Sequence, residues 1–299
     1  MAVLGIDIGG TAIKAGIVTS GGIIEQKATI EIDDLRKGNF IEDLMVWLHP
    51  IINKNNISKA GIGVPGFVSK FEDCLIEIPN LQEIEGDDFI NALKHHFPEV
   101  KFYFSNDANA AAYGAYKFCA EIKTDSFGYI TLGTGMGSAY IENGKIYTGT
   151  NGNGPELGMI HLFGDRTAEQ IVSKDGLLDL AKQLVAASPQ ISQVTLENLH
   201  TIDLYNAALE GDELALKIFD VFGFSFGKIV AVFVQLFDIS TIYIGGGLSP
   251  CLPFMNRSMF TALATKLTGY HLKSLDINEA SLGNDAGIFL CCRFVHLIV

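Results

Sequence analysis

Short apolar runs that end in glycine divide the start of the chain into predicted strands. The run Val3–Ile8 predicts a buried strand, and Gly9-Gly10-Thr11 separates it from a second apolar run, Ile13–Val18. After Gly21-Gly22, a third run extends over Ile23–Ile32. Short apolar runs bounded by glycine are typical of strands joined by tight turns. The pattern therefore predicts a three-stranded meander.

From Asn39 onward, helical and strand patterns alternate. Apolar side chains three or four positions apart predict helices, whereas short continuous apolar runs predict strands. The predicted helices are Asn39–His49, Asp87–Phe97, Ala108–Ala115, Leu214–Phe237 and the tail Asp285–Val299, and the predicted strands are Lys59–Val64, Val100–Phe104, one beginning near Phe127, Ser138–Ile141 and Thr241–Ile244. This mixture predicts an α/β fold.

One pattern occurs twice. Ile6–Thr11 and Ile130–Gly135 both read apolar, polar, apolar and glycine, followed by two small or flexible residues. A strand and a turn follow in each case, so the match continues in order over about 18 residues. We interpret this as a duplicated unit that opens with a glycine-interrupted hairpin, and expect two lobes around a cleft.

Composition and charge exclude several classes of protein. With 48% hydrophobic and 18% charged residues, the chain is not disordered. A net charge of −13 argues against a nucleic-acid partner, because phosphates require a basic patch. The uncharged run Ile229–Phe237 is too short to span a membrane, and the N-terminal residues lack the basic region of a signal peptide. We therefore expect no membrane contact. The five cysteines form no C-x-x-C pair, which favours a reduced, cytoplasmic protein.

Three glycine-rich segments follow predicted strands: Asp7–Thr11, Gly133–Gly137 and Gly245–Gly247. Without a Cβ, the backbone can approach an anion closely, and its N–H groups can cradle phosphate oxygens. Asp7 at the end of a strand could hold Mg²⁺ through water. Facing loops would bracket a polyphosphate chain, and the third segment would admit a flat adenine ring. For each segment alone, an ordinary turn is the competing explanation.

Polar side chains beside these segments suggest acid–base and sugar-binding chemistry. Asn106 and Asp107 lie between a strand and an Ala-rich helix, where either could cap the helix and a carboxylate could act as a general base. Taken alone, the cap is the favoured interpretation. Glu156 and Glu169 could accept hydrogen bonds from sugar hydroxyls, although exposed glutamates are common. By default, His161 is a structural histidine.

Taken together, these segments form a single ordered set of motifs. They are DIGGTAIK at Asp7–Lys14, GVPGFV at Gly63–Val68, PNL at Pro79–Leu81, NDANAAAYG at Asn106–Gly114, TLGTGMGSA at Thr131–Ala139, ELG at Glu156–Gly158 and IGGGLS at Ile244–Ser249. Over nearly the whole chain, the set resembles the ROK family (repressors, open reading frames and sugar kinases) of the actin-like ATPase superfamily.

The resemblance implies a two-lobed ribonuclease-H-like α/β fold, with residues 1–115 and 285–299 in the N-terminal lobe and 116–284 in the C-terminal lobe. It also implies transfer of the γ-phosphoryl group of ATP, with Mg²⁺, to the 6-hydroxyl of a hexose. Asp107 would be the general base, and Asp7 would hold Mg²⁺ through water. The nucleotide-binding residues would be Asp7, Gly9, Gly10, Thr11, Lys14, Gly133, Thr134, Gly135, Gly137, Gly245, Gly246 and Gly247, and the sugar-binding residues would be Gly66, Asn80, Asn106, Asp107, Glu156, Glu169 and His161.

The chain departs from the family pattern at three places. Met159 stands where the family motif E-x-G-H has a histidine that contacts sugar and zinc, and His161 is the nearest substitute. Residues 164–167 replace the zinc-binding cysteine cluster, so we predict no zinc. Ser138-Ala139 resembles the polyphosphate-using glucokinases of the family, so the phosphoryl donor stays open between ATP and polyphosphate.

Glucose is the expected acceptor, with an N-acetylhexosamine (N-acetylmannosamine or N-acetylglucosamine) or mannose as alternatives. A sugar-binding regulator is the alternative outside enzymes. Family repressors carry a helix-turn-helix domain ahead of the kinase-like part, whereas the phosphate hairpin begins here at Asp7. A DNA-binding domain is therefore not expected. Since family members are often dimers, a homodimer is an open expectation.

Overall fold

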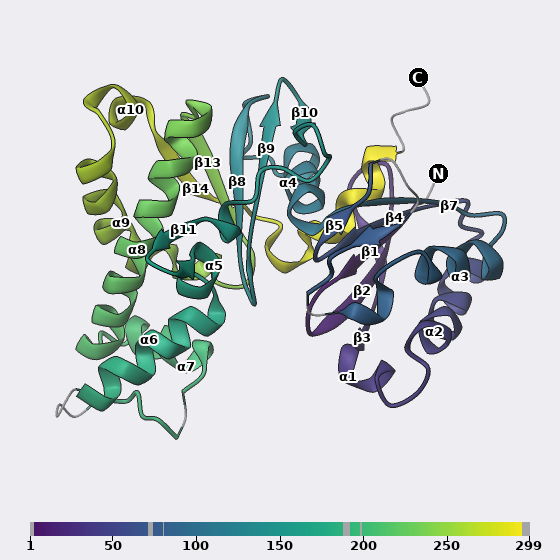
Figure 1. The fold of residues 1–299 in the computed structure, drawn as a ribbon, viewed down its shortest axis with the longest axis horizontal. Helices are drawn as coiled ribbons and strands as arrows, with labels where there is room; N and C mark the ends of the chain where they lie inside the picture. Colours follow the sequence, from purple (N-terminus) through teal and green to yellow (C-terminus); the bar gives the residue numbers. More distant parts are fainter. Residues whose placement is uncertain (1–2, 71–73, 80, 188–191, 198, 295–299) are drawn as a thin grey trace. The chain divides into compact units, whose positions relative to one another are not determined.

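The computed structural model describes residues 3–70, 74–79, 81–187, 192–197 and 199–294 (Figure 1). Contacts between residues divide the chain into two units. Unit 1 comprises Met1–Asp125, Ala139–Pro155 and Asn284–Val299, and unit 2 comprises Ser126–Ser138 and Glu156–Gly283. The division differs from the expected lobes, because residues 116–125 and 139–155 pack with unit 1.

The first sheet has five strands in the order β3-β2-β1-β4-β7. Strands β1, β2 and β3 form the predicted antiparallel meander, and β4 and β7 continue the sheet in parallel with β1. The strand bounds are Val3–Ile8 (β1), Ala12–Val18 (β2), Ile24–Glu31 (β3), Lys59–Val64 (β4) and Lys101–Asn106 (β7), with a two-stranded ribbon of Phe67–Val68 (β5) and Leu75–Ile76 (β6). Parallel pairing places the carboxyl ends of β1, β4 and β7 at the same edge.

Helices bury the apolar faces of this sheet. The helix α2 extends to Lys54, five residues beyond the predicted end, and carries Ile52 into the core. The helices associated with this sheet are Ile32–Leu35 (α1), Phe40–Lys54 (α2), Gln82–Ile84 (η1, 3₁₀), Asp88–His96 (α3) and Asp107–Phe118 (α4).

The tail differs from the predicted α-helix. Gly283–Phe294 forms a 3₁₀ helix (η4), and 295–299 lie outside the described residues. Its backbone lies directly against glycines of unit 1: a Cβ on Gly114 would meet the Ala286 carbonyl oxygen at 2.7 Å, and one on Gly5 would overlap the Ile288 carbonyl oxygen. These backbone contacts, together with the buried side chains of Ile288 and Phe289, hold the segment against unit 1.

The second sheet repeats the strand order of the first, as β10-β9-β8-β13-β14. Strands β8, β13 and β14 are parallel, and β9 and β10 extend the sheet on the other side. The bounds are Phe127–Leu132 (β8), Met136–Glu142 (β9), Lys145–Tyr147 (β10), Thr241–Gly245 (β13) and Asp276–Glu279 (β14). The equal order of two mixed sheets agrees with the duplication interpreted from the sequence and confirms the α/β fold class.

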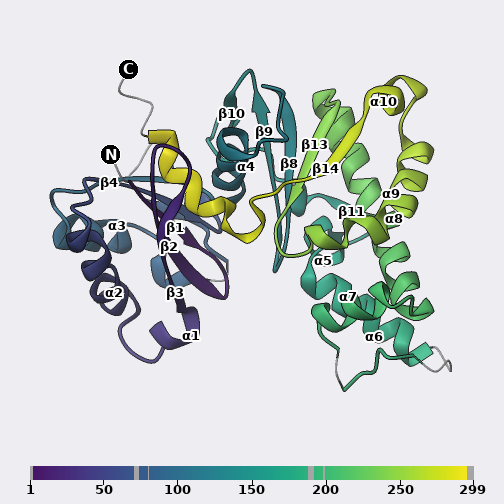
Figure 2. The ribbon, with the colours of Figure 1, turned by 180° about the vertical axis from the view of Figure 1, so that it is seen from behind.

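Unit 2 is built on the long helix α8, Glu213–Phe237, which lies alongside α9, Leu252–Lys266, in both ribbon views (Figures 1 and 2). Among the described residues, α8 is the one helix that is long and apolar enough to cross a membrane, but 61% of its most apolar window is buried inside the protein. That burial is typical of a core helix. The remaining elements are Leu157–Met159 (η2), His161–Phe163 (β11), Arg166–Thr167 (β12), Ala168–Ile171 (α5), Lys174–Ala187 (α6), Thr201–Leu209 (α7), Ser249–Cys251 (η3) and Gly269–Ser274 (α10).

Candidate functional site

Asp7 lies at the carboxyl end of β1, where its backbone pairs with Lys14 of β2 on one side and with Gly63 of β4 on the other. Its side chain is 18% exposed, and Oδ2 lies 3.9 Å from Lys14 Nζ. Burial raises the pKa of the carboxyl group, and Asp285 raises it further, whereas Lys14 opposes the shift. The site thus disfavours the charged carboxylate unless a further positive charge approaches it.

Asn106 and Asp107 occupy the junction between β7 and α4, and the structure separates their roles. Asn106 is the N-cap: its Oδ1 accepts from the amides of Ala108 (3.0 Å) and Asn109 (3.2 Å). Its Nδ2 donates to the Gly66 carbonyl oxygen at 3.3 Å. Asp107 is the first helical residue, and its Oδ1 accepts from the Ala108 amide at 2.7 Å. The helix is therefore capped without the carboxylate of Asp107.

Gly63 brings Asp7 and Asp107 to the same place. A Cβ on Gly63 would lie 3.9 Å from Asp7 Oδ1 and 3.6 Å from Asp107 Cα. Strands β1, β4 and β7 end side by side, so the two acidic residues flank the end of the central strand of the three. Gly63 is the first residue of the motif GVPGFV, but the sequence did not indicate a role for it. Unit 1 thus places two acidic residues beside the end of one strand, and carboxylates are the groups that metal-assisted and acid–base chemistry uses.

The C-terminal 3₁₀ helix η4, which belongs to unit 1, packs against the Asp7 side chain. A Cβ on Gly287 of η4 would meet Asp7 Cγ at 2.5 Å and both carboxylate oxygens within 2.8 Å. Sequence reasoning missed Gly287, because it lies in no recognised motif and its contact joins residues 280 positions apart. Only the folded chain shows that this backbone helps to fix the carboxylate.

We expect Asp7→Asn to raise the melting temperature of the metal-free protein by a few degrees at pH 7.5. Because burial raises the pKa of Asp7 in the folded state, the charged carboxylate destabilises the fold above that pKa, and this cost declines as the pH falls from there toward the ordinary pKa of an aspartate. The stabilisation should therefore shrink at pH 4.5. Melting temperatures in EDTA at both pH values measure this, and a variant less stable than wild type at pH 7.5 would contradict it.

The first glycine turn is open. Gly9 donates its amide to the Ala12 carbonyl oxygen at 3.1 Å, and Ile32 N–H donates to Thr11 O at 2.9 Å, which fixes both ends of the turn. Gly10 and Thr11 are exposed, and a Cβ on Gly10 would meet no atom within 4 Å. The protein's own packing does not require glycine at position 10, so the space beside it is available to a ligand.

The second glycine turn, Gly133–Gly137, is held by hydrogen bonds from its own amides. Three of its amides donate within unit 2: Gly133 to Gly135 O (2.9 Å), Met136 to Glu169 Oε2 (2.8 Å) and Gly137 to Thr131 Oγ1 (3.2 Å). We therefore expect the remaining amides, those of Thr134 and Gly135, to be the ones that face a phosphate.

The third segment lies beside the second. Gly245 pairs with Thr131 of β8, and Leu248 N–H donates to Leu132 O at 2.9 Å. A Cβ on Gly245 would overlap the Tyr129 hydroxyl, and Gly246 has φ +87° against the Leu132 carbonyl. Packing and a tight turn therefore explain these two glycines without a ligand. Gly247 is exposed.

The predicted sugar-binding residues are distributed over both units. Asn106 contacts Gly66 in unit 1, whereas Glu156 lies just before η2 in unit 2 and Glu169 contacts the second glycine turn. Asn80 lies outside the described residues. His161 is exposed at the start of β11, whereas the 56%-exposed Met159 lies in the preceding 3₁₀ helix η2.

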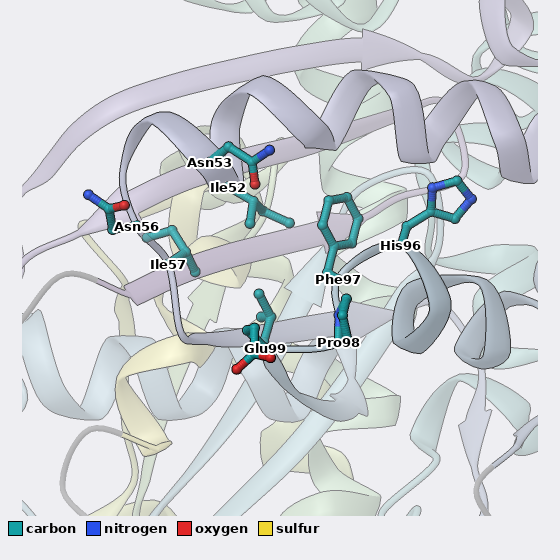
Figure 3. A pocket seen from close by; sticks show the side chains of 9 residues that line it. Ile52, Asn53, Asn56, Ile57, His96, Phe97, Pro98 and Glu99 are labelled. Carbon is teal, nitrogen blue, oxygen red and sulfur yellow. The ribbon is translucent and has the colours of Figure 1, made fainter.

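Unit 1 also contains a hollow of about 320 Å³ (Figure 3). It is lined by Ile52, Asn53, Asn56, Ile57, His96, Phe97, Pro98, Glu99 and Val100. Ile57 lies two residues before β4 and Val100 directly before β7, so the hollow is at the amino ends of these strands, opposite the edge that carries Asp7 and Asp107. It is therefore not part of the candidate site.

The described part of the chain contains no cluster of three or more His, Cys, Asp or Glu side chains arranged to hold an ion. Magnesium does not need such a cluster, because it keeps several waters and binds through one or two carboxylates. The buried, charge-disfavouring environment of Asp7 fits a residue whose carboxylate is compensated by a hydrated cation.

Comparison with known proteins gives one consistent result. Over 310 residues, the chain is 26% identical to the glucokinase of Thermotoga maritima, covering 95% of this chain and 94% of that protein. The structure of a ROK family glucokinase from Streptomyces griseus, in complex with glucose and AMPPNP, matches with a TM-score of 0.86 at 26% identity, covering 98% and 99% of the two chains. A structure from Cytophaga hutchinsonii matches with a TM-score of 0.89 at 29% identity, covering 99% of each chain. The ROK family profile matches residues 3–290, and the chain belongs to the ROK family.

Proposed function

We propose that this protein is an ATP-dependent sugar kinase that phosphorylates the 6-hydroxyl of a hexose, with glucose as the preferred acceptor. The observation that carries the proposal is the meeting of Asp7 and Asp107 beside Gly63 at the carboxyl edge of the first sheet. The relatives named glucokinase, and the Streptomyces griseus complex with glucose and AMPPNP, support the choice of acceptor and donor.

In the proposed reaction, Asp107 accepts the proton of the sugar 6-hydroxyl as that oxygen attacks the terminal phosphorus. Asp107 is the first residue of α4, and its Oδ1 accepts from the Ala108 amide, which orients the carboxylate. Asp7 would hold hydrated Mg²⁺, which supplies charge neutralisation at the transferred phosphoryl group. Lys14 and the open turn at Gly10 would orient the phosphate, because phosphoryl transfer depends mainly on positioning and electrostatics.

Polyphosphate is the second candidate donor. Two glycines of the predicted adenosine segment, Gly245 and Gly246, are required by packing and so give no independent support for a nucleotide. Ser138, part of the Gly-Ser-Ala sequence shared with polyphosphate-using relatives, is buried and accepts from the Leu157 amide at 3.0 Å. A donor comparison therefore belongs in the first experiment.

The test is a coupled assay of the purified protein with Mg²⁺, against glucose, mannose, N-acetylglucosamine and N-acetylmannosamine, using ATP and polyphosphate in parallel. We expect robust turnover of glucose with ATP and none once EDTA removes Mg²⁺. A different preferred sugar or donor would replace those parts of the proposal. Binding of sugar without phosphorylation by either donor would instead support a sugar-binding regulator.

A further inference from the structure

The second glycine turn is anchored from one side by a single stretch of unit 2, residues 158–174. Lys174 N–H donates to Gly133 O at 2.8 Å, and the Glu169 carboxylate accepts from Met136 N–H at 2.8 Å. Gly158 lies so close to the Met136 carbonyl that a Cβ there would overlap it. Both ends of the turn are therefore fixed by backbone or carboxylate groups of this stretch.

Of these three contacts, only that of Glu169 is made by a side chain. Its Oε2 would lie 2.5 Å from a Cβ on Gly135, so the carboxylate is seated directly behind the turn. The short helix α5 that carries it is fixed by a capping box, in which Thr167 Oγ1 accepts from Gln170 N–H and Gln170 Oε1 accepts from Thr167 N–H. Arg166 adds a hydrogen bond of 2.7 Å to the Gln170 carbonyl oxygen. The carboxylate is thus presented from a rigid support.

We propose that Glu169 is a positioning residue for the turn Gly133–Gly137, which sets the directions of the Thr134 and Gly135 amides toward the phosphoryl donor. The inference rests on the proposed function and extends it, because the resemblance assigned Glu169 to the sugar alone. The segment expected to contact sugar would then also determine the shape of the donor loop, through the hydrogen bond from Met136 N–H.

Three variants separate this role from a role in sugar binding. Glu169→Ala removes the acceptor, whereas Glu169→Gln keeps an oxygen that can accept from Met136 N–H. Asp165→Ala removes an exposed carboxylate from the same segment and is the control. Two quantities are measured without sugar: ADP affinity by calorimetry, and amide hydrogen exchange of the peptide covering Thr131–Ala139.

We expect Glu169→Ala to weaken ADP binding by about tenfold and to accelerate exchange in this peptide, with Glu169→Gln and Asp165→Ala within about threefold of wild type. Unchanged exchange and ADP affinity in Glu169→Ala, with a raised KM for sugar alone, would overturn the proposal. If wild type neither binds ADP nor phosphorylates sugar, the proposed function fails. Hydrogen exchange, which needs no ligand, still decides whether Glu169 holds the turn.

Discussion

Asp107→Asn should lower kcat for hexose phosphorylation by about 10²–10⁴-fold, the usual contribution of a general base. Asparagine has nearly the same shape, and its side-chain oxygen can still accept from the Ala108 amide at the 2.7 Å position of Asp107 Oδ1. It cannot accept the proton of the sugar hydroxyl. The KM for sugar should therefore change much less than kcat.

Stability should be nearly unaffected by this substitution, because Asn106 and not Asp107 caps α4. The matched control is Asn106→Ala, which removes the cap and should cost about 1 kcal/mol of unfolding free energy. Steady-state kinetics with the preferred sugar, beside urea denaturation of both variants, measures these effects. An Asp107→Asn enzyme that retains kcat within tenfold of wild type would exclude Asp107 as the base.

Gly287→Ala should destabilise the protein by about 1–3 kcal/mol and also abolish most turnover, although position 287 lies in no motif. The added Cβ would meet Asp7 Cγ at 2.5 Å, so the carboxylate or the η4 backbone has to move. Either movement displaces the group that we propose to hold Mg²⁺. Urea denaturation gives the stability, and the Mg²⁺ concentration that supports half-maximal turnover reports on the site.

Two further variants make this prediction specific. Gly269→Ala is the control, because a Cβ at that glycine would meet no atom within 4 Å. In the double variant Asp7→Ala/Gly287→Ala, the clashing carboxylate is absent, so its stability should be close to that of Asp7→Ala alone. Additive losses of unfolding free energy in the double variant would show that Gly287 does not act through Asp7.

The secondary structure was predictable where a pattern is local. The observed strands β1 and β4 have the predicted bounds, Val3–Ile8 and Lys59–Val64, because a continuous apolar run is buried as a unit. The tail was predicted as a helix and forms a 3₁₀ helix that packs against Gly5 and Gly114. Those contacts join residues far apart in the chain and leave no periodic signal.

For the candidate site, the sequence indicated which residues could take part but not the contacts they make. The sequence alone identified Asp7, Asp107 and the glycine turns as the chemically capable positions, since strand-end carboxylates and glycines carry that chemistry by residue type. It left open whether Asn106 or Asp107 capped α4, and hydrogen-bond directions resolved this. It could not show that the Met136 amide is bound by Glu169, or that packing explains Gly245.

The sequence by itself therefore determined the α/β class, the repeated glycine hairpin and the membership in a family, because these depend on residue type and order along the chain. Only the tertiary structure decided which glycines lie beside open space and which lie against a neighbouring group, and which groups surround Asp7. Distances between residues such as Asp7 and Gly287 depend on strand register and on the path of the chain. Local side-chain patterns do not encode such distances.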